Sequence, residues 1–484
     1  MTSSLASHYT RRDYLQTCLR AAAGSSFLGA IEAVVAGEGA TPQDELSIAP
    51  FRFDVTPPLG HPLCGGWVKH AEAVEDPLEA IGFVLLGHTR PIVLCAVDWV
   101  SLLNEAHVHW REALAEAAGT TPDHVAVHCG HQHDAPFACL EAERIVAQQG
   151  DLPHILDLGF YGECLERARA AVQTALRAPQ RVTHIAHGQA KVEKVASNRR
   201  IFRAADGQVQ AMRGSSCRDS ALRALPVGLI DPWLKTVAFY NGKQKLVACH
   251  YYASHPQSYW GTGRVNSDFP GLARKRRQQD EPDCTHIYFT GCAGNVAAGK
   301  YNDGSPKMRP ILAQRVYDGI VQSEAHLEPE PIERIAWHTR EILPGPRKGK
   351  ARGGGMTKAA IEARIANPDV RVVDRNIAAY MLSWRLRLEK QIPIVLSSLQ
   401  MNDVSLLHLP AECFVEYQLD TQALHPERWI ATAAYGDGGP WYIPTQEEYA
   451  HGGYEVSVSF CDPATDRLLR SGIRTVVEPS GAAG

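Results

Sequence analysis

Two histidines separated by one residue, His131 and His133, follow the apolar run at residues 125–129. Side chains on a strand alternate between its two faces, so a strand that continues to position 133 points both imidazoles in one direction. A neutral imidazole nitrogen is a zinc ligand, and histidine also exchanges protons near neutral pH. The pair therefore predicts a metal site or a site of proton transfer, although a polar loop after a core strand also explains it.

Further candidate ligands stand at the ends of other apolar runs. His255 precedes a proline after residues 246–252, Glu412 follows residues 404–409, and several tyrosines lie within residues 435–454. A catalytic zinc generally has three protein ligands and one position open to water or substrate. Each candidate also has a structural explanation, as a strand cap, as an acid at a helix N-terminus or as a core aromatic. Spacing alone leaves both explanations open.

The elements that must position these residues follow from hydrophobic periodicity and turn signals. Apolar runs that end in polar, glycine-containing loops place those loops along one edge of a sheet, and no internal repeat of fixed period is visible. We therefore expect an α/β fold with a mixed β-sheet core flanked by helices. Strands are predicted at residues 51–55, 80–86, 92–99, 182–194, 234–240, 246–252, 287–290, 392–401 and 404–409, and helices at 105–118, 155–176, 358–366 and 374–388.

Composition limits the functional classes. The 484 residues are 45% apolar and 21% charged, with a net charge of -4, so the chain can bury a large core and has no basic cluster suited to nucleic acid. The segment at residues 344–355, rich in Lys, Arg and Gly, is interpreted as a flexible solvated loop. No segment after the N-terminal region is long and apolar enough to predict a transmembrane helix.

The first forty residues differ from the rest. Residues 10–16, Thr-Arg-Arg-Asp-Tyr-Leu-Gln, fit the twin-arginine pattern of bacterial export signals, and a small apolar stretch follows at residues 21–36. Arg20 and Glu32 interrupt that stretch, which also fits an ordinary amphipathic helix. We predict an export signal and linker in residues 1–40 and the mature, folded part of the chain in residues 41–484. The expected location is periplasmic or extracellular, or cytoplasmic if residues 1–40 are not a signal.

Cysteine usage predicts no structural zinc site. None of the twelve cysteines forms the C-x-x-C pair of zinc ribbons or thioredoxin-like sites, and several lie inside apolar runs. Disulfide pairing and the oligomeric state stay open on the sequence.

Six short motifs, in order, resemble those of the neutral, non-lysosomal ceramidases, which are zinc-dependent amidases that cut N-acylsphingosine into a fatty acid and sphingosine. Together they span most of the chain after residue 130. The motifs are Gly130-His131-Gln132-His133, Ala253-Ser254-His255-Pro256-Gln257-Ser258, Ser267-Asp268-Phe269-Pro270-Gly271, Cys292-Ala293-Gly294-Asn295-Val296, Leu409-Pro410-Ala411-Glu412 and Tyr442-Ile443-Pro444-Thr445-Gln446-Glu447-Glu448-Tyr449.

The resemblance implies a neutral-ceramidase-like catalytic domain with specific site residues. The implied zinc ligands are His131, His255, Glu412 and Tyr442. The residues implied to contact the amide or its oxyanion are His133, Tyr454 and Arg199; a surface arginine beside Arg200 is the alternative for Arg199. Asp98, at a strand end, is a further candidate for orienting a ligand histidine. The chain ends about thirty residues after Tyr454, so the family's C-terminal immunoglobulin-like domain is expected to be missing.

Two departures from the family pattern affect mechanism and substrate. Ala297 and Ala298 stand where the family has a serine proposed to contact substrate, which argues against a serine nucleophile. Asp134 adds a charge that we expect near the pocket mouth, where alkyl chains would disfavour it.

The sequence thus predicts a Zn²⁺-dependent hydrolase that cleaves an amide bond of a small-molecule or lipid N-acyl substrate by metal-activated water. The substrate is a ceramide-like sphingolipid or a related N-acyl compound, and peripheral contact with a membrane is compatible with it. Two alternatives stay open: a metallohydrolase of the amidohydrolase type, and a noncatalytic lipid-binding or carbohydrate-binding protein that retains the fold.

Overall fold

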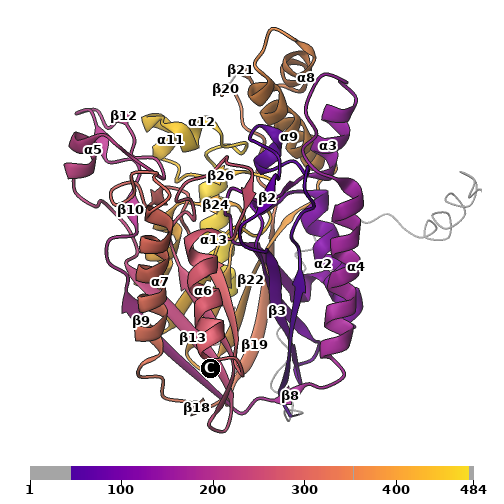
Figure 1. The fold of residues 1–484 in the computed structure, drawn as a ribbon, viewed down its shortest axis with the longest axis vertical. Helices are drawn as coiled ribbons and strands as arrows, with labels where there is room; N and C mark the ends of the chain where they lie inside the picture. Colours follow the sequence, from indigo (N-terminus) through magenta and orange to yellow (C-terminus); the bar gives the residue numbers. More distant parts are fainter. Residues whose placement is uncertain (1–44, 353, 479–484) are drawn as a thin grey trace, which may run out of the picture. The chain divides into compact units, whose positions relative to one another are not determined.

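A computed structural model describes residues 45–352 and 354–478 (Figure 1). The predicted export signal in residues 1–40 lies outside the described residues. Within the described part of the chain, no helix is long and apolar enough to cross a membrane.

Three mixed sheets carry most of the strands, two of them five-stranded and one four-stranded. In each, two antiparallel pairings precede one parallel pairing. The first sheet has the order β6-β4-β3-β1-β8, the second β16-β14-β13-β9-β18 and the third β19-β22-β23-β25. Their strands are β1 (Ser47–Asp54), β3 (Glu79–Leu86), β4 (Ile92–Val97), β6 (Val125–Cys129), β8 (Gln180–Arg181), β9 (His184–Lys191), β13 (Trp233–Asn241), β14 (Gln244–Tyr252), β16 (Thr285–Thr290), β18 (Glu330–Pro331), β19 (Ile335–Ile342), β22 (Ile394–Met401), β23 (Val404–His408) and β25 (Trp429–Ala433).

The same sequence of elements builds each sheet. A hairpin is followed by a helix that returns the chain for a parallel strand: α2 (Glu105–Ala118), α6 (Asp268–Asp280) or α10 (Val415–Leu424). A second helix then follows the parallel strand: α4 (Leu158–Ala175), α7 (Met308–Glu324) or α13 (Thr465–Val477). The chain therefore contains three related units whose unequal insertions hide any fixed sequence period.

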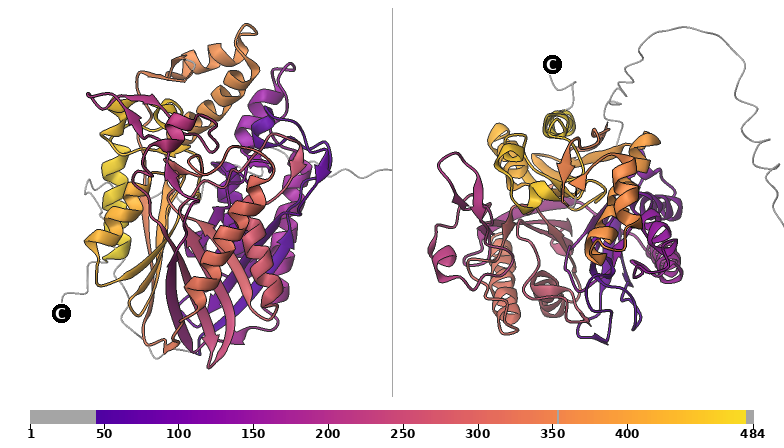
Figure 2. Two further views of the ribbon diagram at one scale, coloured as in Figure 1. Left: turned by 60° about the vertical axis from the view of Figure 1, so that its left-hand side comes forward. Right: turned by 90° about the horizontal axis from the view of Figure 1, so that it is seen from above.

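A central core lies between the three sheets and explains the uninterrupted apolar strands. On β3, Ile81, Phe83 and Leu85 enter a core cluster shared with the other two sheets, whereas Ala80 and Val84 belong to the cluster under the helices. The ring centroids of Phe83 and Phe239 lie 5.2 Å apart across this core. The helices occupy the outside of the sheets when the molecule is seen from above (Figure 2). Both faces of each central strand are thus buried, as parallel pairing with covering helices requires.

The three sheets also meet at one edge, at the carboxyl ends of their parallel strands. Cys129 N donates to Tyr435 O at 2.9 Å, and Ala434 N donates to Thr290 O at 2.9 Å. Thr290 Oγ1 donates to Gly130 O at 2.9 Å. These bonds join the ends of β6, β25 and β16, so the loops that follow strands of all three sheets converge there.

Most predicted strands and helices are present, and the α/β prediction is confirmed. In the segment at residues 344–355, Arg347 N donates to Phe460 O at 3.1 Å and Arg352 N donates to Ser457 O at 2.7 Å, so these two residues are bonded to the chain at and after α12 (Tyr454–Ser457). The remaining elements are η2 (Cys64–Gly66), β2 (Ala73–Val74), β5 (Ser101–Leu102), η3 (Pro122–His124), β7 (Phe137–Ala138), α3 (Leu140–Ala147), β10 (Ser197–Asn198), β11 (Phe202–Arg203), β12 (Val209–Ala211), α5 (Ser220–Ala224), β15 (Arg264–Val265), β17 (Val296–Ala297), β20 (Lys350–Ala351), β21 (Gly354–Gly355), α8 (Lys358–Ala366), α9 (Val372–Glu389), β24 (Glu412–Cys413), β26 (Tyr442–Ile443), α11 (Glu448–His451) and α12 (Tyr454–Ser457).

Candidate metal centre

His131 and His133 lie in the loop after β6 rather than on the strand. The strand ends at Cys129, and His131 has a left-handed backbone with φ of 72°. Gly130 N donates to Val97 O at 2.8 Å, and His131 N donates to Trp99 O at 2.9 Å. The two imidazole centroids are 4.9 Å apart. The histidines do converge, but a turned loop brings them together and the predicted strand alternation is wrong.

Each of the three sheets contributes one side chain to the centre of the site. His131 follows β6, His255 follows β14 and Glu412 follows β23. His131 Nε2 lies 3.0 Å from His255 Nε2 and 3.1 Å from Glu412 Oε2, and His255 Nε2 lies 3.8 Å from the same oxygen. Residues more than a hundred positions apart thus bring three potential ligand atoms together.

The hydrogen bonds behind these side chains indicate the tautomer of each imidazole. His131 Nδ1 lies 2.7 Å from Val100 O, and His255 Nδ1 lies 3.3 Å from Ala293 O. A carbonyl oxygen only accepts, so these contacts favour the tautomer with the proton on Nδ1 and a lone pair on Nε2 in both rings, and the Tyr435 hydroxyl lies a further 3.3 Å from His255 Nδ1.

The three converging atoms consequently lack a donor. Glu412 Oε2 is buried without a hydrogen-bond partner among the described residues. Burial, with His131 and Arg199 nearby, lowers the pKa of His255 well below its ordinary value. His255 therefore stays neutral near pH 7 and does not supply a proton between the converging atoms. Facing lone pairs beside a carboxylate repel one another unless a cation lies between them. The donor set therefore fits a divalent metal ion that accepts nitrogen and oxygen ligands.

His133 lies beside this centre. Candidate ligand atoms of His131, His133 and His255 all fall within 4.8 Å of one another, and His133 Nδ1 is buried without a partner. Burial, together with His131 and Arg199, lowers the pKa of His133 well below its ordinary value, which leaves the ring neutral near pH 7. A neutral imidazole with a free nitrogen can accept a proton or complete a ligand set.

Tyr442, Arg199 and Tyr454 form the adjoining wall. Tyr442 pairs with Glu412 in the parallel bridge between β26 and β24, and Arg199 Nη1 donates to the Tyr442 hydroxyl at 3.4 Å. The Arg199 guanidinium lies 5.5 Å from the Tyr454 ring centroid, and the two tyrosine rings are 5.8 Å apart. Arg199 is buried and pairs with Glu455 at 3.2 Å. The alternative of a surface arginine is therefore wrong.

A cavity of about 450 Å³ opens over the centre. Its apolar wall comes from the η2 loop, β7, α9 and the segment before β26, and its polar wall comes from loops near β10, β12 and β14. The lining residues are Cys64, Trp67, Val100, His131, His133, Phe137, Arg199, Ser215, Ser216, His255, Gln257, Trp260, Arg352, Val373, Ile377, Glu412, Trp441, Tyr442 and Tyr454. Trp67, Ser215, Trp260, Arg352 and Trp441 were not among the sequence candidates, because they carry no spacing signal and reach the cavity from separate loops.

Five of the ten described non-glycine residues with left-handed backbone lie at this cavity or beside its histidines. Cys64, His131, Ala411, Tyr435 and Trp441 have φ values of 46°, 72°, 53°, 60° and 60°. Such conformations cost about 1 to 3 kcal/mol each and persist where the surrounding structure holds them. These five residues lie in the loops that bear or flank the converging side chains, so the surrounding structure holds strained backbone at the candidate site.

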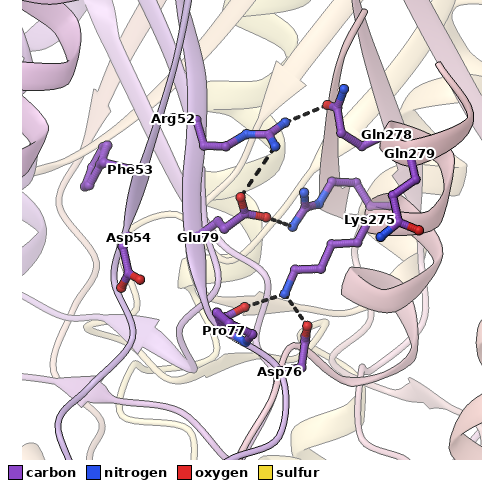
Figure 3. A pocket seen from close by; sticks show the side chains of 10 residues that line it. Arg52, Phe53, Asp54, Asp76, Pro77, Glu79, Lys275, Gln278 and Gln279 are labelled. Atoms are coloured by element: carbon purple, nitrogen blue, oxygen red, sulfur yellow. Dashed lines mark hydrogen bonds and ion pairs between the residues drawn. The ribbon is translucent and has the colours of Figure 1, made fainter. Parts of the chain in front are cut away.

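A larger cavity of about 520 Å³ lies elsewhere, between β1, β3 and α6 (Figure 3). Its charged side chains neutralise one another: Arg274 pairs with Glu79 at 2.7 Å, Arg52 with Glu79 at 3.5 Å and Lys275 with Asp76 at 2.5 Å. No histidine or cysteine lines it. It is an ion-paired groove and offers no reactive group.

The expectations for Asp98 and Asp134 are wrong. Asp98 Oδ2 accepts from Glu79 N at 3.0 Å and lies 3.5 Å from Arg274, while backbone carbonyls orient His131 and His255. Asp134 is 2% exposed and does not line the cavity. Its carboxylate accepts from Gly261 N at 2.8 Å and so lies inside a neighbouring loop. The predicted charge at the pocket mouth is absent, and with it the physical argument against alkyl chains.

The alanines at the family's serine position lie beside the centre. Ala297 and Ala298 are fully buried, and Ala297 forms a parallel bridge with His255. Ser215, on the polar wall, donates its hydroxyl hydrogen to Gln257 Oε1, not to a base. Neither position supplies an activated serine.

Comparison with known proteins reveals similarity only at the level of structure. No protein-family model and no curated protein sequence matches the chain. A structure described as "Ceramidase complexed with C2" matches with a TM-score of 0.65 and 14% identity, covering 88% of this chain and 74% of that chain. A neutral ceramidase structure from Pseudomonas aeruginosa matches with a TM-score of 0.63 and 14% identity, over 88% of this chain and 73% of that one. The fold is ceramidase-like, and the sheets differ from the closed barrel of the amidohydrolase alternative.

Proposed function

We propose that the protein is a zinc-dependent hydrolase that cleaves the amide bond of an N-acyl substrate of the ceramide-like class. The observation that carries the proposal is the convergence of His131 Nε2, His255 Nε2 and Glu412 Oε2 without a donor. The ceramidase-like fold supports the substrate class.

Zinc is the metal that this donor set suits best. Imidazole and carboxylate ligands are typical of catalytic zinc, and Tyr442 adjoins Glu412 as a proposed fourth ligand. Bound zinc supplies Lewis acidity, which makes water nucleophilic near neutral pH and polarises a carbonyl group. The carbonyls of Val100 and Ala293 hold the two ligand imidazoles in the tautomer that this role needs.

The remaining residues supply proton transfer and charge stabilisation. His133 is neutral and has an unpartnered Nδ1, so it can take the proton from attacking water and return it to the leaving amine. Arg199 and Tyr454 face the same cavity and donate to the oxygen that gains negative charge. Each such donor is commonly worth about 3 to 4 kcal/mol.

The apolar wall of the cavity favours an alkyl-bearing substrate. Trp67 contacts Phe137 and Trp441, with ring centroids 6.1 Å and 6.3 Å away, and Tyr380 packs on the same rings. Such a surface binds acyl or alkyl chains by the hydrophobic effect. Because the Asp134 carboxylate is buried against residues 261 and 262, no carboxylate from that position opposes a ceramide-like lipid.

The proposal is tested by metal analysis combined with hydrolysis of N-octanoylsphingosine, N-palmitoylsphingosine and N-octanoylethanolamine. About one zinc per chain, release of fatty acid, loss of activity with a chelator and recovery with zinc are expected. A protein that neither contains nor binds zinc, and that releases no fatty acid, is instead the noncatalytic binding protein.

We also propose export through the twin-arginine route, supported by residues 10–16. Expression of the full chain in a bacterium, with and without the Arg11→Lys, Arg12→Lys double substitution, tests this. The natural sequence is expected in the periplasm or medium and the double variant in the cytoplasm; equal cytoplasmic retention of both contradicts export.

A further inference from the structure

We propose that Trp260 determines substrate specificity by contacting the substrate portion attached to the amide nitrogen, and that Asp134 is a positioning residue that holds the loop bearing Trp260. The inference rests on the proposed amide hydrolysis and goes beyond it by assigning roles to two residues outside the ligand and donor set.

The Asp134 side chain is the anchor of the loop. Its Oδ1 accepts from Gly261 N at 2.8 Å and from Thr262 N at 3.3 Å, and its Oδ2 accepts from Thr262 Oγ1 at 3.2 Å. A carboxylate that accepts several hydrogen bonds from one short segment fixes that segment strongly. Because Asp134 directly follows His133, it ties the loop to the catalytic segment.

The residues on both sides of Trp260 are fixed as well. The Arg309 guanidinium lies 3.7 Å from the Tyr259 ring centroid, and its Nη2 donates to Tyr259 O at 2.9 Å. Gly263 has a left-handed φ of 75°, and a Cβ there would lie 2.7 Å from His70 O. The backbone therefore docks closely on the segment before β2 and leaves the loop little freedom.

Trp260 is the exposed part of this anchored loop. It is 41% exposed, it lines the cavity, and its ring centroid lies 5.3 Å from that of His133. An indole held partly in solvent beside a reactive histidine exposes apolar area that the fold itself does not bury. Rigid aromatic side chains of this kind bind ligands at a small cost in conformational entropy.

The position beside His133 indicates which part of the substrate Trp260 contacts. His133 serves the amide nitrogen when it returns a proton, whereas Arg199 and Tyr454 serve the carbonyl oxygen. The group on nitrogen therefore leaves the centre past His133 and meets Trp260. A cavity of about 450 Å³ is in the lower part of the range for ligand pockets, so a long alkyl chain extends to its mouth.

The experiment compares two substrates with the same acyl group, N-octanoylsphingosine and N-octanoylethanolamine, on the zinc-loaded enzyme. Trp260→Ala is expected to raise KM for the sphingosine amide about tenfold, with kcat and zinc content unchanged, and to leave KM for the ethanolamide within about twofold. Trp260→Phe should recover most of the loss. Phe202→Ala is the control, because Phe202 is 45% exposed but does not line the cavity.

Asp134 is tested through a double-mutant cycle. Asp134→Asn keeps the side-chain size, weakens the acceptor and should raise KM for N-octanoylsphingosine about threefold to tenfold. In the Trp260→Ala background the same change should have almost no effect on KM. An equal effect in both backgrounds, or a change confined to kcat, overturns the positioning role.

Other outcomes separate this inference from the proposed function. A Trp260→Ala penalty that depends on acyl length rather than on the amine, or no penalty at all, overturns the specificity role while hydrolysis stands. If the natural enzyme hydrolyses neither amide, the proposed function fails. The role of Trp260 is then tested by calorimetry, which compares the affinity of the natural protein and of Trp260→Ala for N-octanoylsphingosine. Equal affinity, or no binding to either, overturns the inference.

Discussion

Two buried histidine clusters in this molecule contain similar residues but differ in how their protons are arranged. One is the candidate metal centre, with His131, His133 and His255. The other lies on the second sheet beneath α6 and α7, where His250 and His286 combine with glutamates in sets whose ligand atoms are also within 4.8 Å of one another. The residue types and the distances between ligand atoms do not distinguish the two clusters, but the hydrogen bonds do.

In the second cluster, one direction of donation runs from Thr236 through both imidazoles to a carboxylate. Ser323 lies 2.6 Å from Thr236 Oγ1, which lies 2.9 Å from His250 Nδ1. His250 Nε2 lies 2.9 Å from His286 Nδ1, and His286 Nε2 lies 3.2 Å from Glu281 Oε2. Thr236 can donate to His250, His250 to His286 and His286 to Glu281, with both imidazoles neutral, while the Ser323 hydroxyl donates to Ile320 O at 2.8 Å.

Charge is also balanced in the second cluster. Lys245 pairs with Glu281 at 2.7 Å and with Glu324 at 2.9 Å, and Arg277 pairs with both at 2.5 Å. Two cations thus face two carboxylates, and a metal ion would add uncompensated charge. At the candidate centre, by contrast, both ligand imidazoles donate outward to carbonyls, and Glu412 Oε2 has no donor. Convergence of lone pairs without a donor therefore distinguishes the candidate metal centre from the second cluster.

The largest expected effect comes from removing one histidine from each cluster. His255→Ala should lose zinc and reduce hydrolysis to background, because a ligand is removed. His286→Ala should keep zinc and kcat/KM and lose about 1 to 3 kcal/mol of unfolding free energy, because buried partners lose a hydrogen bond. Metal analysis measures the zinc content, steady-state kinetics measures kcat/KM, and urea unfolding measures the unfolding free energy of both variants. Zinc retained by His255→Ala and lost by His286→Ala would reverse the comparison.

A smaller effect is expected from the donors beside the metal centre. Tyr454→Phe should lower kcat about 100- to 1,000-fold with zinc content unchanged, because one donor to the developing oxyanion is removed. Tyr449→Phe is the matched control, since the Tyr449 hydroxyl donates to Cys461 O at 3.1 Å and does not line the cavity. Equal kcat for both variants would remove Tyr454 from the mechanism.

Removing a side-chain group that supports the proposed ligands should have a more modest effect, on zinc affinity. Tyr435 stacks on His131 at 4.3 Å, and its hydroxyl lies 3.3 Å from His255 Nδ1. Tyr435→Phe should weaken zinc affinity about tenfold, measured by competition with a chromophoric chelator. Tyr251→Phe, which removes a buried hydroxyl without a partner in the central core, should leave zinc affinity unchanged. A similar loss in both variants contradicts the supporting role.

The smallest effect concerns pH. Burial lowers the pKa values of His250 and His286, whereas hydrogen bonds from His286 and Lys245 outweigh burial and lower the pKa of Glu281 to about 2. The unfolded chain protonates histidine below about pH 6.5 and glutamate below about pH 4.3, while these folded groups resist protonation. Stability from this cluster is therefore present at neutral pH and falls on acidification.

This second cluster should respond to substitution in a defined way. His286→Gln should reduce the slope of unfolding free energy against pH below about pH 6.5, by at most about 1.4 kcal/mol per pH unit. Urea unfolding from pH 7 to pH 5 measures the slope. An unchanged slope would indicate that His286 is protonated in the folded protein, in contradiction to a neutral imidazole that accepts from His250 and donates to Glu281.

Local pattern predicted many elements correctly. The hairpins of β3 with β4 and of β13 with β14, and helices α2 and α8, follow from apolar runs, turns and periodicity. Helices α6, α7 and α13 were not predicted from the sequence. Helix α6, Asp268–Asp280, consists largely of charged and polar residues and lies against the second sheet through only a few apolar side chains. Its helical state depends on that packing, which a local pattern does not reveal.

The site was predicted in its residue types and misjudged in its geometry. His131, His255 and Glu412 converge as the motifs implied, yet His131 does so through a left-handed turn. Arg199 is buried because Glu455, far along the chain, pairs with it. Asp134 is a loop anchor because residues 261 and 262 return to it. Each of these facts depends on a partner distant in sequence.

The sequence by itself determined the strands, the hairpins and the side chains able to bind a metal ion, because these depend on local hydrophobic pattern and residue chemistry. Only the tertiary structure decided that one ligand comes from each sheet, and which imidazole nitrogens carry protons. The physical reason is that the edge where the sheets meet is closed by hydrogen bonds between chain segments hundreds of residues apart. The same closure selects the carbonyls that leave the lone pairs of His131 and His255 directed at one another.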